Sequence, residues 1–253
     1  MLKTIKKALE VKSGNIVSAV GAGGKTTFLQ TLARELAGQA KPVIVTTTTR
    51  IFPPVGLEPL LLIDQQSCRD AIEKALLKAK KGPGVIYLGR EINGEGKVVG
   101  LSPEQVDILK TLSSYALVEA DGAAGKSFKA PAGHEPVIPE KTDILCCVVG
   151  LEVLGKPLTN QYVHRPQRVS SITGLQEGEL ITPEAIAMVL TSQKGYYRSE
   201  YRCVPVLNQA DTLEDIKNGF NIAEKIFSMS VIIERVLITS FKNDPYMIIT
   251  VKR

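Results

Sequence analysis

Short apolar runs alternate along the chain with longer segments in which apolar residues recur every three or four positions. The short runs match buried strands in length and β-branched content, and the longer segments match amphipathic helices. We predict strands over residues 16–20, 42–46, 60–63, 84–88, 115–120, 143–150, 201–207, 236–239 and 246–251. We predict helices over residues 26–37, 67–80, 182–190 and 212–227, and another that begins after Ser102. Strands joined by helical crossovers favour an α/β fold with three layers and a mostly parallel sheet.

Three segments depart from this alternation. An Asn-Gly turn signal within residues 92–101 predicts a hairpin. Residues 125–141 are polar and proline-rich without a period, which is typical of a long functional loop, and residues 160–178 are irregular with one short helix. No linker rich in Pro, Gly or Ser divides the chain, so we expect a single domain over residues 1–253. Small β extensions are expected near residues 91–101 and at the C-terminus.

The charge and the apolar runs of the chain indicate which classes of partner to expect. Lys and Arg number 31 against 26 Asp and Glu, a mild excess of positive charge without a basic stripe interleaved with aromatics. We therefore expect no nucleic-acid partner. No apolar run approaches the roughly 20 residues of a membrane span, so we expect none. The N-terminus resembles an amphipathic helix and not a secretion signal.

The four cysteines have no C-x-x-C spacing. Cys146 and Cys147 are adjacent in a predicted strand and should point to opposite faces, while Cys68 and Cys203 stand alone in the sequence. We expect buried free thiols in a cytoplasmic protein.

A glycine-rich stretch joins the first predicted strand to the first predicted helix. Residues 19–27 read A-V-G-A-G-G-K-T-T, which is typical of a phosphate-binding loop. Backbone N–H groups of Gly21, Ala22, Gly23 and Gly24 are expected to surround the β-phosphate, and the start of the helix directs its dipole at the anion. Ala19 stands where the full pattern has its first glycine. The alternative is a glycine-rich turn with an incidental lysine.

The residues after the glycines suggest specific roles. Lys25 is expected to reach the β- and γ-phosphates, and the Thr26 hydroxyl to hold Mg²⁺. Thr27 would add a hydroxyl near the α-phosphate. Together with the strand and helix pattern, these residues predict a P-loop NTPase fold that binds Mg²⁺ with GTP or ATP.

Two carboxylates lie at the end of the predicted strand at residues 115–120. Glu119 and Asp121 are two positions apart, so both side chains could lie on one side of an extended segment. One is expected to hold Mg²⁺ or its water, and the other to orient the attacking water. The residues do not decide which is which, and solvated acids that cap a strand end are the alternative.

A second motif follows the predicted strand at residues 201–207. Asn208-Gln209-Ala210-Asp211 reads N-Q-x-D, close to the N-K-x-D of guanine-binding P-loop proteins. Asn208 would then tie the base loop to the phosphate loop, and Asp211 would accept hydrogen bonds from guanine. Gln209 in place of lysine weakens the choice of purine, and an Asx turn is the alternative.

The threonines at residues 46–49 end the second predicted strand, at the edge that faces ligands in a parallel sheet. They either sense the γ-phosphate or metal, or simply finish the strand.

Four blocks of the sequence together resemble the YqeC family over residues 16–227. The blocks read G-A-G-G-K-T-T, T-T-T-T-R-I-F-P-P, V-E-A-D-G-A-A-G-K-S-F-K-A-P-A-G-H-E-P-V-I-P and L-N-Q-A-D. This is a P-loop family described as accessory to selenium-dependent molybdenum hydroxylases. The resemblance implies a cytoplasmic accessory protein whose partner is a molybdenum hydroxylase or its cofactor machinery.

Within P-loop proteins, the chain resembles the group that includes nickel-insertion GTPases and dethiobiotin synthetase. Many of these are dimers, and many carry an extra lysine where Val20 stands here. The resemblance therefore leaves a homodimer open but does not imply a lysine that reaches across it.

Three functions fit these residues. The first is a Mg²⁺-dependent nucleotide hydrolase that serves cofactor delivery or insertion. The second is a small-molecule kinase or ligase whose substrate is held by residues 125–141. The third is a non-catalytic switch that binds nucleotide and a partner protein.

Overall fold

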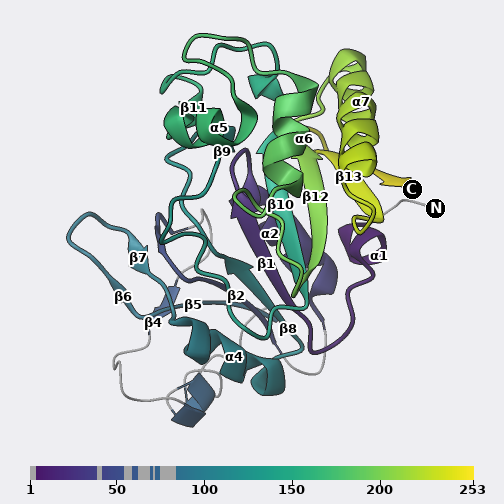
Figure 1. Cartoon of the computed structure of the whole chain (residues 1–253). Coiled ribbons are helices and arrows are strands. Elements are labelled where there is room, and N and C mark those ends of the chain that lie inside the picture. Colours follow the sequence, from purple (N-terminus) through teal and green to yellow (C-terminus); the bar gives the residue numbers. More distant parts are fainter. Residues whose placement is uncertain (1–3, 39–41, 54–58, 62–68, 71, 75–83) are drawn as a thin grey trace.

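The computed structural model describes residues 4–38, 42–53, 59–61, 69–70, 72–74 and 84–253. Its main sheet is built from β1 (Ile16–Gly21), β2 (Val43–Thr47), β4 (Pro59–Leu61), β5 (Val85–Gly89), β8 (Tyr115–Glu119), β10 (Ile144–Gly150), β12 (Arg202–Asn208), β13 (Arg235–Ser240) and β14 (Met247–Lys252). The strand order is β14-β13-β12-β10-β1-β8-β2-β5-β4. All neighbours pair in parallel except β13 and β14 (Figure 1). The predicted mostly parallel sheet is therefore confirmed, and its last strand, β14, is antiparallel.

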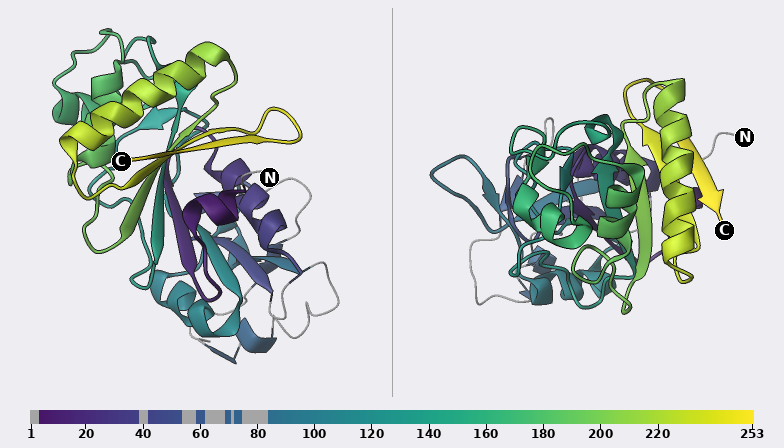
Figure 2. Two further views of the ribbon diagram at one scale, coloured as in Figure 1. Left: turned by 90° about the vertical axis from the view of Figure 1, so that its right-hand side faces the viewer. Right: turned by 45° about the horizontal axis from the view of Figure 1, so that its top comes forward.

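Helices cover both faces of this sheet, which confirms the three-layer α/β prediction (Figure 2). Helices α1 (Ile5–Leu9) and α2 (Lys25–Leu36) pack on one face. Helices α4 (Pro103–Leu112), α6 (Pro183–Thr191) and α7 (Leu213–Met229) pack on the other. The predicted helix at residues 67–80 falls mostly outside the described residues. None of the described helices combines the length and apolarity needed to cross a membrane.

The alternation of side chains in β10 shows how the layers form. Leu145, Cys147 and Val149 pack into the core under α6 and α7, while Cys146 and Val148 pack into the core under α2. Successive strand residues point to opposite faces, so a strand covered on both sides must be apolar throughout. This is why the run reads as continuous apolar sequence.

The same alternation brings two cysteines together. Cys203 lies opposite Leu145 in the pairing of β12 with β10, on the same face as Cys147. Interaction between the two thiols raises the pKa of Cys147 and lowers that of Cys203. Cys147 donates to backbone carbonyls of Leu145 or Tyr196, and Cys203 donates to that of Arg198. Cys146, Cys147 and Cys203 are free and buried, while Cys68 lies outside the described residues. Cys203 therefore does not stand alone in the fold, since strand pairing joins residues that are distant in sequence.

Helix α4 begins with the signals that its sequence carries. The Ser102 side chain accepts a hydrogen bond from the Gln105 N–H, the Gln105 side chain accepts one from the Ser102 N–H, and Pro103 occupies the first helical position. This reciprocal cap satisfies two of the N–H groups that a helix leaves free. The predicted start after Ser102 is confirmed.

Smaller elements lie at the rim. Strands β6 (Glu91–Ile92) and β7 (Val98–Val99) form the predicted hairpin, joined by β3 (Arg50–Ile51). Strands β9 (Phe128–Lys129) and β11 (Val163–His164) pair in parallel beside helix α5 (Pro166–Thr173). We call β9, β11, α5 and their connecting loops the cap. It lies over the carboxyl ends of β1, β8 and β10 (Figure 1).

Candidate functional site

The carboxyl ends of four parallel strands meet under the cap. Gly21 ends β1, Glu119 ends β8, Gly150 ends β10 and Asn208 ends β12. Ligands of parallel α/β sheets bind outside this edge, where loops diverge and backbone groups are available. The sheet thus gathers the glycine-rich loop, the predicted carboxylates and the N-Q-x-D motif in one place.

The glycine-rich loop is tightly enclosed. Gly21, Gly23 and Gly24 have φ values of 95°, 85° and 108°, which favour glycine. A Cβ on Gly23 would lie 2.2 Å from the Gly150 nitrogen, and one on Gly24 would lie 2.4 Å from Asn208 Nδ2. Both the backbone conformation and the close approach of β10 and β12 therefore require glycine here.

Three N–H groups of this loop have acceptors within the protein. The Gly21 N–H donates to both oxygens of Asp121 at 3.1 and 3.0 Å. The Ala22 N–H donates to the Val148 carbonyl, and the Gly23 N–H donates to the Lys126 carbonyl. These residues shape the turn, whereas a phosphate would find its donors at residues 24–27. No side-chain hydrogen bond caps α2 at its N-cap, Gly24, and the first N–H groups of a helix have no intrahelical acceptor.

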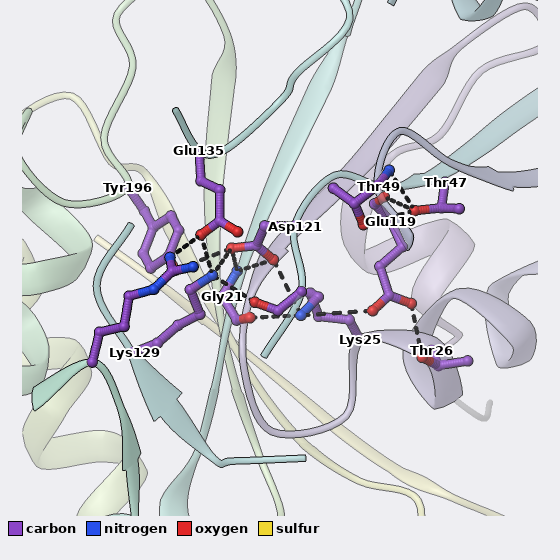
Figure 3. A network of polar contacts seen from close by, with 12 residues as sticks. Gly21, Lys25, Thr26, Thr47, Thr49, Glu119, Asp121, Lys129, Glu135 and Tyr196 are labelled. Carbon is purple, nitrogen blue, oxygen red and sulfur yellow. Dashed lines mark hydrogen bonds and ion pairs between the residues drawn. The ribbon is translucent and has the colours of Figure 1, made fainter. Parts of the chain in front are cut away.

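Lys25 occupies the centre of the site and is only 4% exposed. Its Nζ donates to the Gly21 carbonyl at 2.6 Å. It also lies 3.1 Å from Asp121 Oδ1 and 3.7 Å from Glu119 Oε1. Figure 3 shows the ammonium group between the two carboxylates. Lys25 therefore neutralises both acids at the start of α2.

Glu119 belongs to the side of the site that holds Thr26. The Thr26 hydroxyl donates to Glu119 Oε2 at 2.8 Å. Burial raises the pKa of Glu119, although the charge of Lys25 and the hydrogen bond from Thr26 act against it. A hydroxyl and a carboxylate at a helix N-terminus are oxygen ligands of the kind Mg²⁺ prefers, so this donor set fits the ion.

Asp121 has a different environment and is fully buried. Besides Gly21 and Lys25, its Oδ2 accepts a hydrogen bond from the Tyr196 hydroxyl at 3.2 Å and lies 3.2 Å from Lys129 Nζ. Figure 3 places Asp121 and Glu119 on opposite sides of Lys25, and not together as the two-residue spacing suggests. The reason is that β8 ends at Glu119, so strand alternation does not continue to Asp121.

The ionic network continues from Asp121 into the cap. Lys129 Nζ donates to Glu135 Oε2 at 2.8 Å and to the Gly122 carbonyl at 2.6 Å. Arg165 donates to the same Glu135 oxygen at 2.6 Å. Burial favours a raised pKa for Glu135, but Lys129 and Arg165 outweigh it and lower the pKa. No motif in the sequence indicates Tyr196 or Arg165, which come from segments far from the glycine-rich loop.

The N-Q-x-D motif also contacts the glycine-rich loop. Asn208 Nδ2 donates to the Gly23 carbonyl at 2.7 Å, and its Oδ1 accepts a hydrogen bond from Thr239 at 2.9 Å. Asp211 is exposed, and its Oδ1 accepts a hydrogen bond from the Ser240 hydroxyl at 2.5 Å. The expected tie between Asn208 and the phosphate loop is thus present. Sequence reasoning missed Thr239 and Ser240, which end β13 beside the motif.

Gln209 replaces the lysine of the guanine motif and is oriented inward. Its φ is 63°, and among the described residues its buried Oε1 has no hydrogen-bond partner. A Cβ on Gly150 would lie 1.8 Å from this oxygen. Gln209 therefore packs against the end of β10.

The threonines at the end of β2 donate hydrogen bonds to backbone carbonyls. Thr46 donates to the Leu88 carbonyl at 2.8 Å, and Thr47 donates to the Glu119 carbonyl at 2.7 Å. Thr48 donates to the Val137 carbonyl at 2.6 Å. These bonds agree with the simpler alternative, in which the threonines finish the strand, and Thr47 also holds the backbone of Glu119.

In the part of the chain that the structure describes, no three His, Cys, Asp or Glu residues gather into a metal cluster.

Comparison with known proteins places these residues in a family. The family model described as YqeC protein matches residues 17–167, which contain the glycine-rich loop, both carboxylates and most of the cap. A protein of Escherichia coli (strain K12) described as "Uncharacterized protein YqeC" is 32% identical over 195 residues. The match covers 76% of this chain and 74% of that relative.

Proposed function

The chain belongs to the YqeC family, and from that premise we propose that it binds and hydrolyses a Mg²⁺–nucleoside triphosphate. One observation carries the proposal: Lys25, Thr26 and Glu119 converge at the uncapped N-terminus of α2. Backbone N–H groups, a lysine and an oxygen pair in this arrangement are complementary to a triphosphate and its cation.

Each residue of the proposed nucleotide site has a distinct role. Residues 24–27 offer N–H donors to the phosphates, and Lys25 neutralises charge on the β- and γ-phosphates. Thr26 and Glu119 would hold Mg²⁺, which supplies neutralisation of the charge that develops on the phosphate oxygens. Asp121 fixes the positions of Gly21 and Lys25. The candidate for orienting water is therefore Glu119, directly or through a bound water.

The position of Asp211 favours GTP over ATP. Ser240 orients its carboxylate, and Asn208 connects the same loop to Gly23. A fixed carboxylate can accept hydrogen bonds from the two N–H donors on one edge of guanine. Adenine presents no matching pair of donors there. Gln209 stands in place of the lysine of the N-K-x-D motif and is oriented inward. It therefore does not supply the side-chain stem that this lysine packs on the base.

The biological role follows from the family resemblance alone. We propose that nucleotide turnover serves maturation of a selenium-dependent molybdenum hydroxylase or its cofactor. Contact with that enzyme and self-association as a homodimer belong to the same proposal.

A second function is favoured by a separate cavity. A hollow of about 460 Å³ adjoins the glycine-rich loop and is lined by residues that include Lys126, Ser127, Glu152 and Lys156. Lys126 and Gly23 share a backbone hydrogen bond, so this hollow lies beside the proposed phosphate site. A small acceptor held there would make the protein a kinase or ligase.

Titration of the purified chain with GTP and ATP, each with and without Mg²⁺, tests the proposal. We expect Mg²⁺-dependent GTP binding with slow turnover, and loss of binding in Lys25→Ala. Circular dichroism must accompany that variant, because Lys25 is buried between two acids. Triphosphate binding that survives in folded Lys25→Ala would refute the assignment. Turnover that requires an added small acceptor would favour the kinase or ligase.

A further inference from the structure

A second polar cavity lies between the cap and the loop after α6, apart from the glycine-rich loop. It has a volume of about 300 Å³. Its walls come from the loop at residues 131–135, from α5 and from the loop after α6. Helices α5 and α6 contact each other, which holds these walls together. A hollow of this size suits a small molecule and not a macromolecular segment.

The charges in this cavity are strongly unequal. Arg168, Lys194 and Arg198 line it, and Glu135 is its only lining carboxylate among the described residues. Within the described part of the chain, the side chains of Arg168 and Lys194 have no acidic partner. Three cations that converge on one hollow favour an anion.

The third cation is held in place by its own loop. Arg198 Nη1 donates to the carbonyls of Gln193 at 3.0 Å, Gly195 at 3.1 Å and Tyr197 at 2.7 Å. Carbonyl acceptors fix the guanidinium without cancelling its charge. A pre-positioned charge costs less side-chain entropy when a ligand binds.

Glu135 does not oppose an anion, because two cations already hold it. Its Oε2 accepts hydrogen bonds from Lys129 and Arg165 at 2.8 and 2.6 Å. Lys129 in turn lies 3.2 Å from Asp121, which lies 3.1 Å from Lys25 (Figure 3). Buried ion pairs therefore connect the wall of the cavity to the glycine-rich loop.

We propose that this cavity is a binding site for a small molecule bearing a phosphate or carboxylate group. We further propose, resting on the nucleotide function above, that its occupancy is coupled to the nucleotide. A bound anion changes the electrostatic environment of Glu135, which lines the cavity, and the change passes through Lys129 and Asp121 to Lys25. Such coupling is reciprocal, so each ligand alters the affinity of the other by the same factor.

Backbone-amide NMR titration with inorganic phosphate, and separately with succinate, tests the site. The variant Arg168→Ser/Lys194→Ser removes the two cations that lack acidic partners. Its control is Arg34→Ser/Lys217→Ser, which removes the same two charges from exposed positions on α2 and α7. We expect at least about tenfold weaker binding in the cavity variant and unchanged binding in the control. Whichever probe binds more tightly identifies the functional group.

The titration is run without nucleotide and again with saturating GDP. Phosphate that stays bound with GDP present, and whose binding is weakened in the cavity variant, lies outside the glycine-rich loop, as the proposal requires. Equal affinity in the cavity variant and the control, or failure of both probes to bind the wild-type chain, would overturn the site. A protein that binds no nucleotide would refute the nucleotide function and the coupling, while the titration without GDP would still decide the cavity.

Discussion

At the scale of single residues, the main result is the separation of two carboxylates that are two positions apart. Glu119 faces Thr26, while Asp121 is enclosed by Gly21, Lys25, Lys129 and Tyr196. A group with a half-buried neighbour can exchange a protein partner for a ligand, whereas a group with several buried partners cannot do so cheaply. We therefore assign ligand contact to Glu119 and a positioning role to Asp121.

Substitution of these two acids by their amides separates the roles. Glu119→Gln should weaken Mg²⁺-dependent nucleotide binding about 10- to 100-fold with little loss of stability. Asp121→Asn should lower the free energy of unfolding by about 3–5 kcal/mol, because it leaves Lys129 buried without its full counter-charge. Nucleotide titration and urea denaturation measure the two effects. The reverse pattern would show that Asp121 serves the metal.

The choice between guanine and adenine depends on a single carboxylate. Asp211→Ala should reduce the preference for GTP over ATP by about tenfold or more, since hydrogen bonds to a charged acceptor are lost. Ser240→Ala should reduce the preference less, because it only releases the carboxylate. Competition binding with both nucleotides measures the ratio. An unchanged ratio in Asp211→Ala would show that the motif is only a turn.

At the scale of elements, the start of α2 and the loop before it form one rigid unit. The backbone of Gly23 is held by the Lys126 carbonyl and by Asn208, and β10 approaches it closely. The loop is thus shaped by two neighbouring strand ends and by the loop that contains Lys126 before any ligand arrives. Prepositioned N–H donors favour anion binding because little backbone ordering remains to be done.

Gly23→Ala tests this rigidity. The left-handed backbone alone should cost about 1–2 kcal/mol, and the approach of Gly150 to within 2.2 Å of the new Cβ adds to it. Gly94→Ala is the control, since its Cβ would meet nothing within 4 Å. We expect that control to change stability by no more than about 0.5 kcal/mol. Thermal and urea unfolding compare them, and equal stabilities would contradict the enclosed loop.

At the scale of the whole molecule, the cap and the sheet are joined by alternating charges. The chain of contacts runs Lys25, Asp121, Lys129, Glu135, Arg165, from α2 to the start of α5. Buried ion pairs contribute little to stability overall, but breaking one is costly because it isolates a buried charge. The network is therefore suited to holding the cap in one position over the site.

The network predicts how stability depends on pH. The pKa of Glu135 is lowered from its ordinary value of 4.5, because Lys129 and Arg165 outweigh burial. Ionised Glu135 thus stabilises the fold above pH 4.5 and loses this contribution as the pH falls through the lowered value. The stability difference between wild type and Glu135→Gln should be largest at neutral pH and shrink in acid. A difference that grows below pH 4.5 would contradict this.

Local pattern was enough to predict much of the fold. The apolar runs in β10 and β12, the start of α4 and the strand at β14 could all be predicted, since strand length, capping residues and turns are local properties. The same holds for the glycine-rich loop, whose glycines and lysine are consecutive. Asn208 was found because its motif directly follows a strand.

What the sequence determined by itself was the three-layer fold class and the identity of Lys25, Thr26, Glu119 and Asn208 as candidates. Only the tertiary structure decided that Asp121 turns away from Thr26, that Ser240 holds Asp211 and that Tyr196 and Arg165 complete the buried network. The physical reason is that these contacts join loops from different strand ends. Their geometry depends on where each strand stops and on which strands are neighbours, and neither is encoded in a local period.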